Sequence, residues 1–328
     1  MAELKFNKLD GPLGQKVDDL FGDDLPLLEV EPGNILVPPK FQNFADRLLN
    51  MKVRPDDVWL VAYPRTGSSW MQEMVWCIGN NLNFQRAAKF LCLRAPVFEL
   101  SAMLRRDSSG VTGLIGETID LVERMPSPRF IKSYLPKELL PRQLETVKPK
   151  IIYMCRNPKE VAPSYYDFCR LFYDLEGPFE DFCELFLQNK VPMGPFWNHV
   201  LGFWKIRNEP NVLFLRQEKV AKDHESTVDM VSKFLGKDLT TEGREALLDH
   251  MSDEKIKANP SISVRPMLEF RKNMLPRSRA SSSTSSSGSE SGLNPKPGMF
   301  EARLTEDMAK RFDEWAKKNL EGTGLSFD

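Results

Sequence analysis

The clearest chemical signal in the sequence is a run of five residues, Arg65, Thr66, Gly67, Ser68 and Ser69. The run follows a near-continuous apolar stretch, Asp57–Tyr63, typical of a strand buried on both faces, and precedes a helical pattern from Trp70. Where a strand leads into a helix, free backbone N–H groups and the positive end of the helix dipole form an anion site. One cation, one glycine and three hydroxyl groups therefore favour a phosphate-type ligand, although a simple capped helix with Arg65 on the surface is the alternative. The spacing differs from the GxxxxGKS or GxxxxGKT loop of ordinary nucleotide hydrolases.

Several longer segments resemble signature motifs of the cytosolic sulfotransferases. Tyr63–Trp70 (YPRTGSSW) resembles the phosphate loop of that family, and Arg156–Phe168 (RNPKEVAPSYYDF) resembles its second cofactor motif. Arg129–Pro136 (RFIKSYLP) resembles the strand that carries the catalytic residues, while Phe196–Trp204 and Arg311–Phe327 resemble a later helix and the C-terminus. Because the matches keep the order of the family, the chain is identified as a divergent member of it.

The resemblance implies both a fold and a cofactor. The fold is α/β, a P-loop-type three-layer domain with a central, mostly parallel sheet flanked by helices. The co-substrate is 3′-phosphoadenylyl sulfate (PAPS), and no metal is implied. By resemblance, the cofactor would be bound by Arg65, Thr66, Gly67, Ser68, Ser69, Trp70, Arg156 and Ser164. Of these, Trp70 would lie near the adenine, and Arg156 and Ser164 would hold the 3′-phosphate. The catalytic positions would be those of Lys132, Tyr134 and Arg65.

Two of these positions depart from the family pattern. Arg65 replaces the lysine of the loop, and a guanidinium still binds phosphate, in a bidentate manner. Tyr134 replaces the catalytic histidine, which is the more serious change. A phenol has an ordinary pKa of about 10, so roughly a thousandth of it is ionised at pH 7. Tyr134 is therefore either a weak general base assisted by Lys132 or a hydrogen-bonding wall residue.

Other departures affect the nucleotide site. Gln217 takes the place of a tyrosine of the family, and Asp253 takes the place of an apolar adenine contact. The R-K-G clamp that the family places on the 3′-phosphate is not recognisable. Candidate replacements are Arg271, Lys272, Arg277 and Arg279.

Two functions from different classes fit these residues. The first is a PAPS-dependent sulfotransferase that moves a sulfuryl group to a hydroxyl, of a phenol or an alcohol, on a small lipophilic molecule. The second is a catalytically weak or inactive sulfotransferase-fold protein that binds nucleotide or a small lipophile. The presence of Lys132, Arg156 and Ser164 favours the enzyme, whereas Tyr134 leaves its turnover open. Aromatic residues between Tyr165 and Tyr173 are candidates either for the acceptor pocket or for the helix core.

The composition limits the partners. With 328 residues and a net charge of −1, the chain has no basic field for nucleic acid or an anionic membrane surface. Residues 1–10 intersperse charges among apolar side chains, so we expect no secretory signal. The five cysteines have no CxxC spacing, which indicates reduced thiols. We therefore expect a cytoplasmic protein whose partner is a small lipophilic acceptor.

Alternating strands and helices must position these residues. Besides Asp57–Tyr63, strands are expected at Arg129–Tyr134, Lys150–Arg156 and Asn211–Gln217. Helices are expected at Phe41–Met51, Trp70–Gly79, Pro158–Phe172, Phe179–Asn189, Phe196–Arg207, Glu225–Leu235 and Glu242–Met251. This alternation predicts βαβ units in a single sulfotransferase domain over residues 1–328. The Ser-rich stretch 280–292 cannot bury apolar surface and is expected to be a flexible loop.

A short motif near the C-terminus bears on assembly. The dimer motif of the family, K-x-x-x-T-V-x-x-x-E, aligns with Glu301, Thr305, Glu306 and Lys310, with the acid now first and the base last. A two-fold contact stays complementary when both signs are exchanged. The motif therefore predicts a weak homodimer, and the alternative is a solvated helix start with Thr305 as its N-cap.

Overall fold

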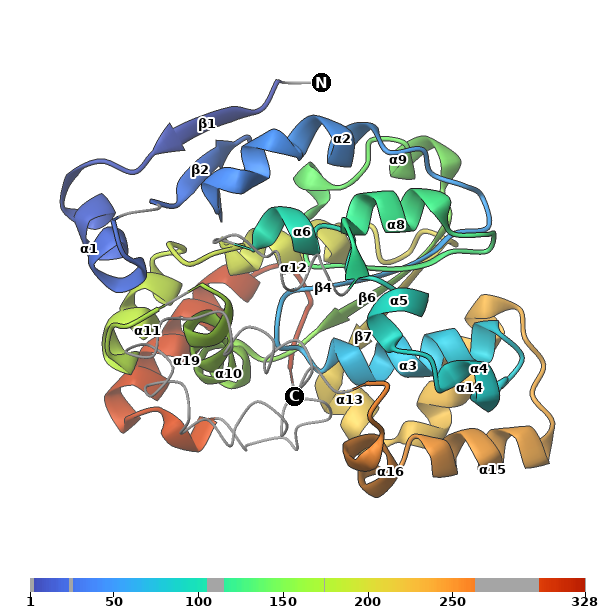
Figure 1. The fold of residues 1–328 in the computed structure, drawn as a ribbon. Coiled ribbons are helices and arrows are strands. Elements are labelled where there is room, and N and C mark those ends of the chain that lie inside the picture. Colours follow the sequence, from blue (N-terminus) through green and yellow to red (C-terminus); the bar gives the residue numbers. More distant parts are fainter. Residues whose placement is uncertain (1–2, 24–25, 105–114, 174, 263–300, 328) are drawn as a thin grey trace.

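The computed structural model describes residues 3–23, 26–104, 115–173, 175–262 and 301–327, and Figure 1 traces the chain. The strands are β1 Lys5–Lys8, β2 Leu28–Glu31, β3 Ile35–Val37, β4 Val58–Ala62, β5 Phe130–Ser133, β6 Lys150–Cys155 and β7 Val212–Arg216. The helices before β6 are α1 Gly11–Phe21, η1 Pro39–Asn43, α2 Ala45–Asn50, α3 Ser68–Gly79, α4 Phe84–Ala87, α5 Leu91–Arg94, α6 Leu100–Met103, α8 Thr118–Arg124, η2 Lys137–Leu139 and α9 Leu144–Val147. The later helices are α10 Pro158–Phe172, α11 Phe179–Leu187, α12 Phe196–Lys205, α13 Gln217–Lys222, α14 His224–Leu235, α15 Thr241–His250, α16 Asp253–Ala258, η3 Glu301–Arg303 and α19 Glu306–Leu320.

A parallel sheet with the strand order β5-β4-β6-β7 forms the centre of the molecule. Every residue of β4 is buried, as its apolar sequence VWLVA predicts for a strand covered on both faces. Val61 of β4 pairs with Ser133 of β5 and with Tyr153 of β6. The three strands therefore reach the same edge of the sheet, where their carboxyl ends lead into the candidate site.

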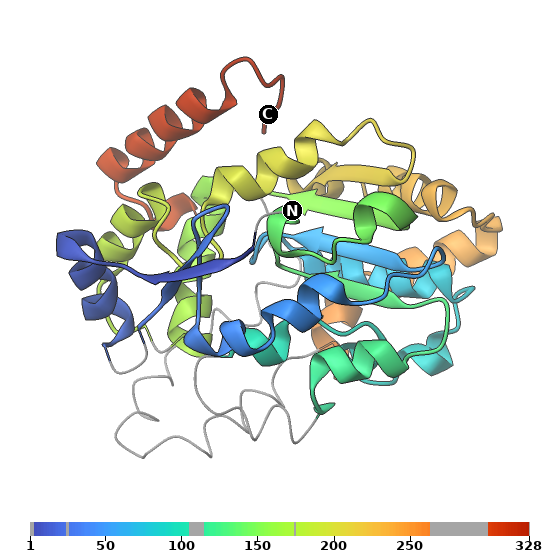
Figure 2. The ribbon, with the colours of Figure 1, turned by 90° about the horizontal axis from the view of Figure 1, so that it is seen from above.

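Alternate residues of β4 face two different cores. Trp59 and Val61 belong to a core that includes side chains of α10, α11, α12 and α19. Leu60 and Ala62 belong to a second core with α3, α14 and α15. Figure 2 shows α19 (red) and α15 (orange) on opposite sides of the molecule. The structure thus confirms the predicted α/β class, with helices on both faces of a parallel sheet.

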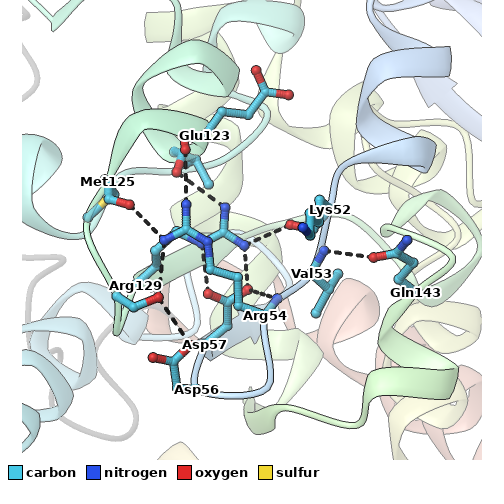
Figure 3. Close-up of polar contacts among 11 residues, drawn as sticks. Lys52, Val53, Arg54, Asp56, Asp57, Glu123, Met125, Arg129 and Gln143 are labelled. Atoms are coloured by element: carbon cyan, nitrogen blue, oxygen red, sulfur yellow. Dashed lines mark hydrogen bonds and ion pairs between the residues drawn. The ribbon is translucent and has the colours of Figure 1, made fainter.

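A buried ion pair holds the start of β5 against the start of β4 (Figure 3). Arg129 Nε donates to Asp57 Oδ1 at 2.7 Å, and each residue is 1% exposed. The guanidinium also donates to the carbonyl groups of Lys52 at 2.8 Å and Val122 at 3.3 Å. Because a buried cation is costly without close partners, this network fixes the strand that ends with Lys132 and Ser133.

The N-terminal region contains more structure than its sequence predicted. β1, β2 and β3 form an antiparallel sheet, and α1 packs beside α11 (Figure 1). Val30 and Ile35 are almost completely buried in the first core. Strands of three or four residues give too few alternations for a periodic pattern, which explains why the sequence did not indicate β1 to β3. The 11-residue helix α1 was not predicted either.

The later elements follow the predicted positions closely. α10 spans the predicted range, and β4 to β7 each lie inside their predicted strands. Thr305 caps α19 as expected, since its hydroxyl accepts from the Met308 N–H at 3.2 Å. In the described ranges, no helix is long and apolar enough to cross a bilayer. The Ser-rich stretch 280–292 and the four clamp candidates lie outside the described residues.

Candidate active site

The loop between β4 and α3 has the backbone of an anion cradle. Arg65 has φ 71° and Gly67 has φ 79°, both left-handed, so the chain curls sharply before α3 begins at Ser68. A Cβ atom at Gly67 would lie 2.8 Å from Gln217 Oε1, and the positive φ would add strain for any other residue. Backbone N–H groups at such a turn, next to a helix N-terminus, are the donors that bind phosphate. The predicted strand–loop–helix is present.

The hydroxyl groups of this loop fit an anionic ligand. Thr66 is completely buried, and its Oγ1 has no hydrogen-bond partner among the residues that the structure describes. A buried hydroxyl without a partner costs about 1–3 kcal/mol, which a phosphate oxygen in the loop would recover. Ser68 is buried at the start of α3, and Ser69 follows it with its hydroxyl in a hydrogen bond. The donor set therefore fits a phosphate or phosphosulfate group.

Lys132 reaches the loop from the neighbouring strand. It pairs with Leu60 of β4, and its Nζ donates to Ser69 Oγ at 3.1 Å. Its side chain is almost completely buried. The same Nζ lies 4.9 Å from the centre of the Tyr134 ring, within the range of a cation–π contact. The ammonium group thus lies between the anion loop and the ring that replaces the histidine of the family.

The backbone of Tyr134 is held by two buried residues. Glu99 Oε1 accepts the Tyr134 N–H at 2.7 Å, and Glu99 Oε2 accepts the Ser133 hydroxyl at 2.9 Å. From the other side, His199 Nε2 lies 3.0 Å from the Tyr134 carbonyl oxygen, and His199 Nδ1 lies 2.8 Å from the Tyr153 hydroxyl. A carbonyl oxygen only accepts, so Nε2 carries the proton and Nδ1 accepts from Tyr153.

Burial shifts the pKa of Glu99 and that of His199. It raises the pKa of Glu99 to about 7 and lowers the pKa of His199 to about 4, because the charged form of each is poorly solvated. His199 is therefore neutral near pH 7 and orients Tyr134 without acting on it as a cation. Glu99 is not among the residues singled out from the sequence, because an acid inside the apolar stretch Ala95–Leu100 does not indicate its partners.

The residue after β6, Arg156, and Ser164 of α10 both reach the same loop. Arg65 Nε donates to Ser164 Oγ at 2.8 Å, and Arg156 Nη1 lies 3.5 Å from the Arg65 carbonyl oxygen. Arg156 is 1% exposed and pairs with Glu160, with Nη2 2.5 Å from Oε2. Burial lowers the pKa of Arg156 to about 10, and the Glu160 carboxylate opposes this shift. Both sets of predicted cofactor residues therefore meet at one place.

The chain returns to this place after residue 300. The Glu301 N–H donates to Glu160 Oε1 at 3.1 Å, and the Glu301 carboxylate lies 2.8 Å from Lys159 Nζ. Arg303 lies 2.7 Å from Asp167, which belongs to α10 as do Lys159 and Glu160. Glu160 thus uses one oxygen for Arg156 and the other for the returning backbone.

The structure places Trp70, which is predicted to lie near the adenine, in the interior near the start of α3. It is 1% exposed, its indole N–H donates to the Met251 carbonyl at 3.0 Å, and its ring lies 4.7 Å from the ring of His224. These contacts join α3 to α14 and to the end of α15. No pattern around His224 indicates its contact with Trp70.

A hollow of about 120 Å³ adjoins the loop. Its polar end is formed by Arg65, Ser69, Lys132 and Tyr134, and its apolar part by Val97, Leu100, Phe168, Leu171 and Phe172. Of the aromatic residues proposed for an acceptor pocket, Phe168 and Phe172 line the hollow, whereas Tyr165 and Tyr166 are buried in the core. An apolar hollow with polar groups at one end is suited to a small lipophile with one reacting polar group.

A cluster of metal-ligand types lies elsewhere on α3. Among the described residues, Glu73, Cys77 and His250 bring such atoms together. Glu73 is already paired with Arg94 and lies 2.9 Å from His250 Nε2. The Cys77 thiol donates to the same carboxylate at 3.5 Å, and burial raises its pKa. A carboxylate that is already paired with Arg94 and a protonated thiol make a structural network that ties α3 to α15, because a cysteine binds a metal as the thiolate.

Comparison with known proteins agrees with this geometry. A family model described as a sulfotransferase domain matches residues 55–324. Luciferin sulfotransferase of Photinus pyralis is 34% identical over 295 residues, which cover 87% of this chain and 77% of that protein. Sulfotransferase 1B1 of Canis lupus familiaris is 32% identical over 290 residues, covering 88% and 91%. The crystal structure of retinol dehydratase in complex with androsterone and the inactive cofactor PAP matches with a TM-score of 0.82 at 26% identity, covering 99% of this chain and 98% of that one. The chain therefore belongs to the sulfotransferase family, as a divergent member of its PAPS-dependent cytosolic group.

Proposed function

We propose that the protein transfers a sulfuryl group from PAPS to the hydroxyl group of a small lipophilic molecule. The observation that carries this proposal is the convergence of two distant segments on one loop. Lys132 contacts Ser69 at 3.1 Å, and Ser164 accepts from Arg65 at 2.8 Å. When bound, PAPS supplies the sulfuryl group and a bisphosphate leaving group. The PAP-bound neighbour supports this choice of co-substrate.

Different residues of the chain would bind the two anionic ends of PAPS. In this assignment the N–H groups of the loop and Thr66 Oγ1 bind the 5′-phosphosulfate end, with Arg65 beside them. Arg156 and Ser164 bind the 3′-phosphate. Lys132 supplies positive charge where negative charge develops during transfer, and such preorganised charge is a major source of rate enhancement. Its burial strengthens the effect, because water does not screen it there.

Tyr134 decides which acceptors react well. As a phenol next to Lys132, it accepts the proton of the acceptor poorly compared with a histidine. We infer that acceptors which are already acidic, such as phenols, react better than aliphatic alcohols. The luciferin sulfotransferase relative and the retinol dehydratase neighbour suggest an acceptor panel with both phenols and an allylic alcohol such as retinol.

The first experiment measures sulfuryl transfer from labelled PAPS across this panel, with the products analysed for a sulfate ester and also for loss of water. Lys132→Met keeps the size of the side chain and removes its charge, so it should lower kcat strongly. Lys150→Met removes another lysine of the sheet, at the start of β6, and serves as the matched control. Equal turnover of Lys132→Met and the control would contradict the role of Lys132.

The second experiment restores the histidine. Tyr134→His should raise the turnover of alcohols more than that of acidic phenols, by up to about 10²–10⁴-fold, the usual range of general-base help. A pH profile of kcat/KM that gains an acidic limb in the variant, with the rate falling as the imidazole becomes protonated, would identify the base. If turnover rises for neither acceptor class, the replacement of histidine by Tyr134 does not limit the reaction.

The alternative is a protein that binds nucleotide or lipophile with little turnover, and the Tyr134 substitution is the observation that favours it. Calorimetry with adenosine 3′,5′-bisphosphate distinguishes the cases. Binding without transfer in any acceptor class supports this alternative. Absence of nucleotide binding would contradict the sulfotransferase and the nucleotide-binding form of the alternative.

A further inference from the structure

A second and larger hollow lies away from the active site. It has a volume of about 590 Å³ and is bounded by α2, η2, α9, α12 and the starts of β6 and β7. Ile151 and Val212 line it at the amino ends of their strands, whereas the phosphate loop follows the carboxyl end of β4. Within the described residues, the lining has no member in common with the active-site hollow. We call it the basal cavity.

The floor of the basal cavity is apolar and firmly packed. It is formed by Leu140, Leu144, Ile151, Phe203 and Val212, each less than a tenth exposed. The Phe203 ring stacks on Tyr153 with 4.4 Å between ring centres, which fixes its position. Cavities of roughly 300–1,000 Å³ with such walls are the size of small-molecule sites in proteins.

The rim of the cavity carries charges that cancel. Three cations (Lys137, Arg142 and Lys148) face three acids (Glu138, Glu145 and Glu209). Lys137 pairs with Glu145 at 3.2 Å, and Lys148 pairs with Glu209 at 2.7 Å. Arg142 donates to the Asn50 side chain at 3.3 Å. With its charges matched in this way, the rim favours a neutral ligand over an anion or a cation.

One residue of the lining, Asn211, has a side-chain oxygen that lacks a donor. Asn211 Nδ2 donates to the Pro149 carbonyl at 2.8 Å, so the orientation of the amide is determined. Asn211 Oδ1 is buried and has no hydrogen-bond partner within the described part of the chain. Since an unsatisfied buried acceptor is costly, a ligand that donates to this oxygen gains affinity.

We propose that the basal cavity binds a neutral, compact lipophilic molecule that carries one hydrogen-bond donor, and that Asn211 Oδ1 accepts from this donor. The site is separate from the acceptor site and does not depend on sulfuryl transfer.

The test uses 6-fluoro-2-naphthol, which has a flat apolar body and one hydroxyl donor, observed by fluorine NMR without PAPS so that no product forms. Two matched variants each place an indole in one hollow. Ile206→Trp obstructs the basal cavity, and Leu171→Trp obstructs the active-site hollow. Both parent side chains are half-buried. Glu138→Trp, at an exposed rim position, replaces Ile206→Trp if that variant does not fold.

We expect bound probe in Leu171→Trp, in which the active-site hollow is obstructed, and loss of this bound signal when Ile206→Trp is added to Leu171→Trp. A Leu171→Trp variant that binds no probe, or a bound signal that survives the addition of Ile206→Trp or Glu138→Trp to Leu171→Trp, overturns the proposal.

The donor is tested with 6-fluoro-2-methoxynaphthalene, which has the same body but cannot donate. In Leu171→Trp, the naphthol should bind about 3- to 10-fold more tightly than the ether, the usual worth of one hydrogen bond. Adding Asn211→Leu should bring this ratio close to one. Equal affinities of the two probes before that change would overturn the assignment of Asn211 and of the ligand class.

Discussion

Removing Arg156 should weaken nucleotide binding at the proposed 3′-phosphate site in two ways. Arg156→Ala deletes charge-assisted hydrogen bonds, which contribute about 1.5–3 kcal/mol to binding, or roughly 10- to 150-fold in affinity. The structure adds a second effect. Glu160 lies 2.5 Å from the guanidinium and is 4% exposed, so the variant leaves a buried carboxylate facing the incoming phosphate. The loss should therefore lie toward the upper end of this range.

A double-mutant cycle separates the two effects. Glu160→Gln keeps the size and removes the charge, so Arg156→Ala/Glu160→Gln should bind adenosine 3′,5′-bisphosphate more tightly than Arg156→Ala. Directly interacting residues commonly give coupling energies of about 0.5–3 kcal/mol. Arg170→Ala, at an exposed position of α10, is the control and should bind the nucleotide like the parent.

The assay is isothermal titration calorimetry at constant salt, with two nucleotides. Adenosine 3′,5′-bisphosphate carries the 3′-phosphate, and adenosine 5′-phosphosulfate does not. The effect of Arg156→Ala should be confined to the first. If the variant binds both nucleotides as the parent does, or weakens both equally, Arg156 does not read the 3′-phosphate.

Three further predictions concern stability and assembly. Asp57→Asn breaks the buried pair with Arg129 and should lower the free energy of unfolding by about 3–5 kcal/mol in urea titrations, whereas the exposed Asp56→Asn should change it little. Burial raises the pKa of Glu99 from 4.5 to about 7, so its contribution to stability is present below pH 4.5 and is lost as the pH rises through 7. The stability of the parent minus that of Glu99→Gln should fall across this window by up to about 3 kcal/mol, and a flat difference curve would contradict the shift. For the predicted weak homodimer, sedimentation at tens of micromolar should show an association that high salt and Glu301→Lys both weaken. A parent that stays monomeric removes the case, and the ion pair of Glu301 within its own chain is the competing interaction.

The central part of the fold was readable because several signals coincide there. The apolar run at β4 ends in a glycine–hydroxyl loop, and helical periodicity resumes immediately afterwards. The motif on β5 placed Lys132 in the sequence, and the parallel register then brings it to Ser69. In such cases one segment carries enough local information to determine its own structure.

The remaining features depend on long-range contacts. The short strands β1 to β3 are stabilised by one another and by the core, so no local pattern indicates them. The role of Glu99 arises only in the folded chain, where its carboxylate accepts a hydrogen bond from the backbone of Tyr134. The pairing of Asn211 with Pro149 and the shape of the basal cavity likewise arise from elements that are distant in sequence.

The Arg156–Glu160 pair also has a consequence for competition among anions. A guanidinium whose charge is matched by a carboxylate 2.5 Å away exerts little attraction at a distance, so inorganic sulfate or phosphate gains little by binding there alone. A nucleotide anchored first at the loop presents its 3′-phosphate at a high effective concentration. Under the proposed assignment, this phosphate would displace the carboxylate from part of the guanidinium, a step that a small free anion lacks the additional contacts to drive. Recognition would thus be conditional, with the second phosphate site becoming attractive only to a ligand that is already held by the first.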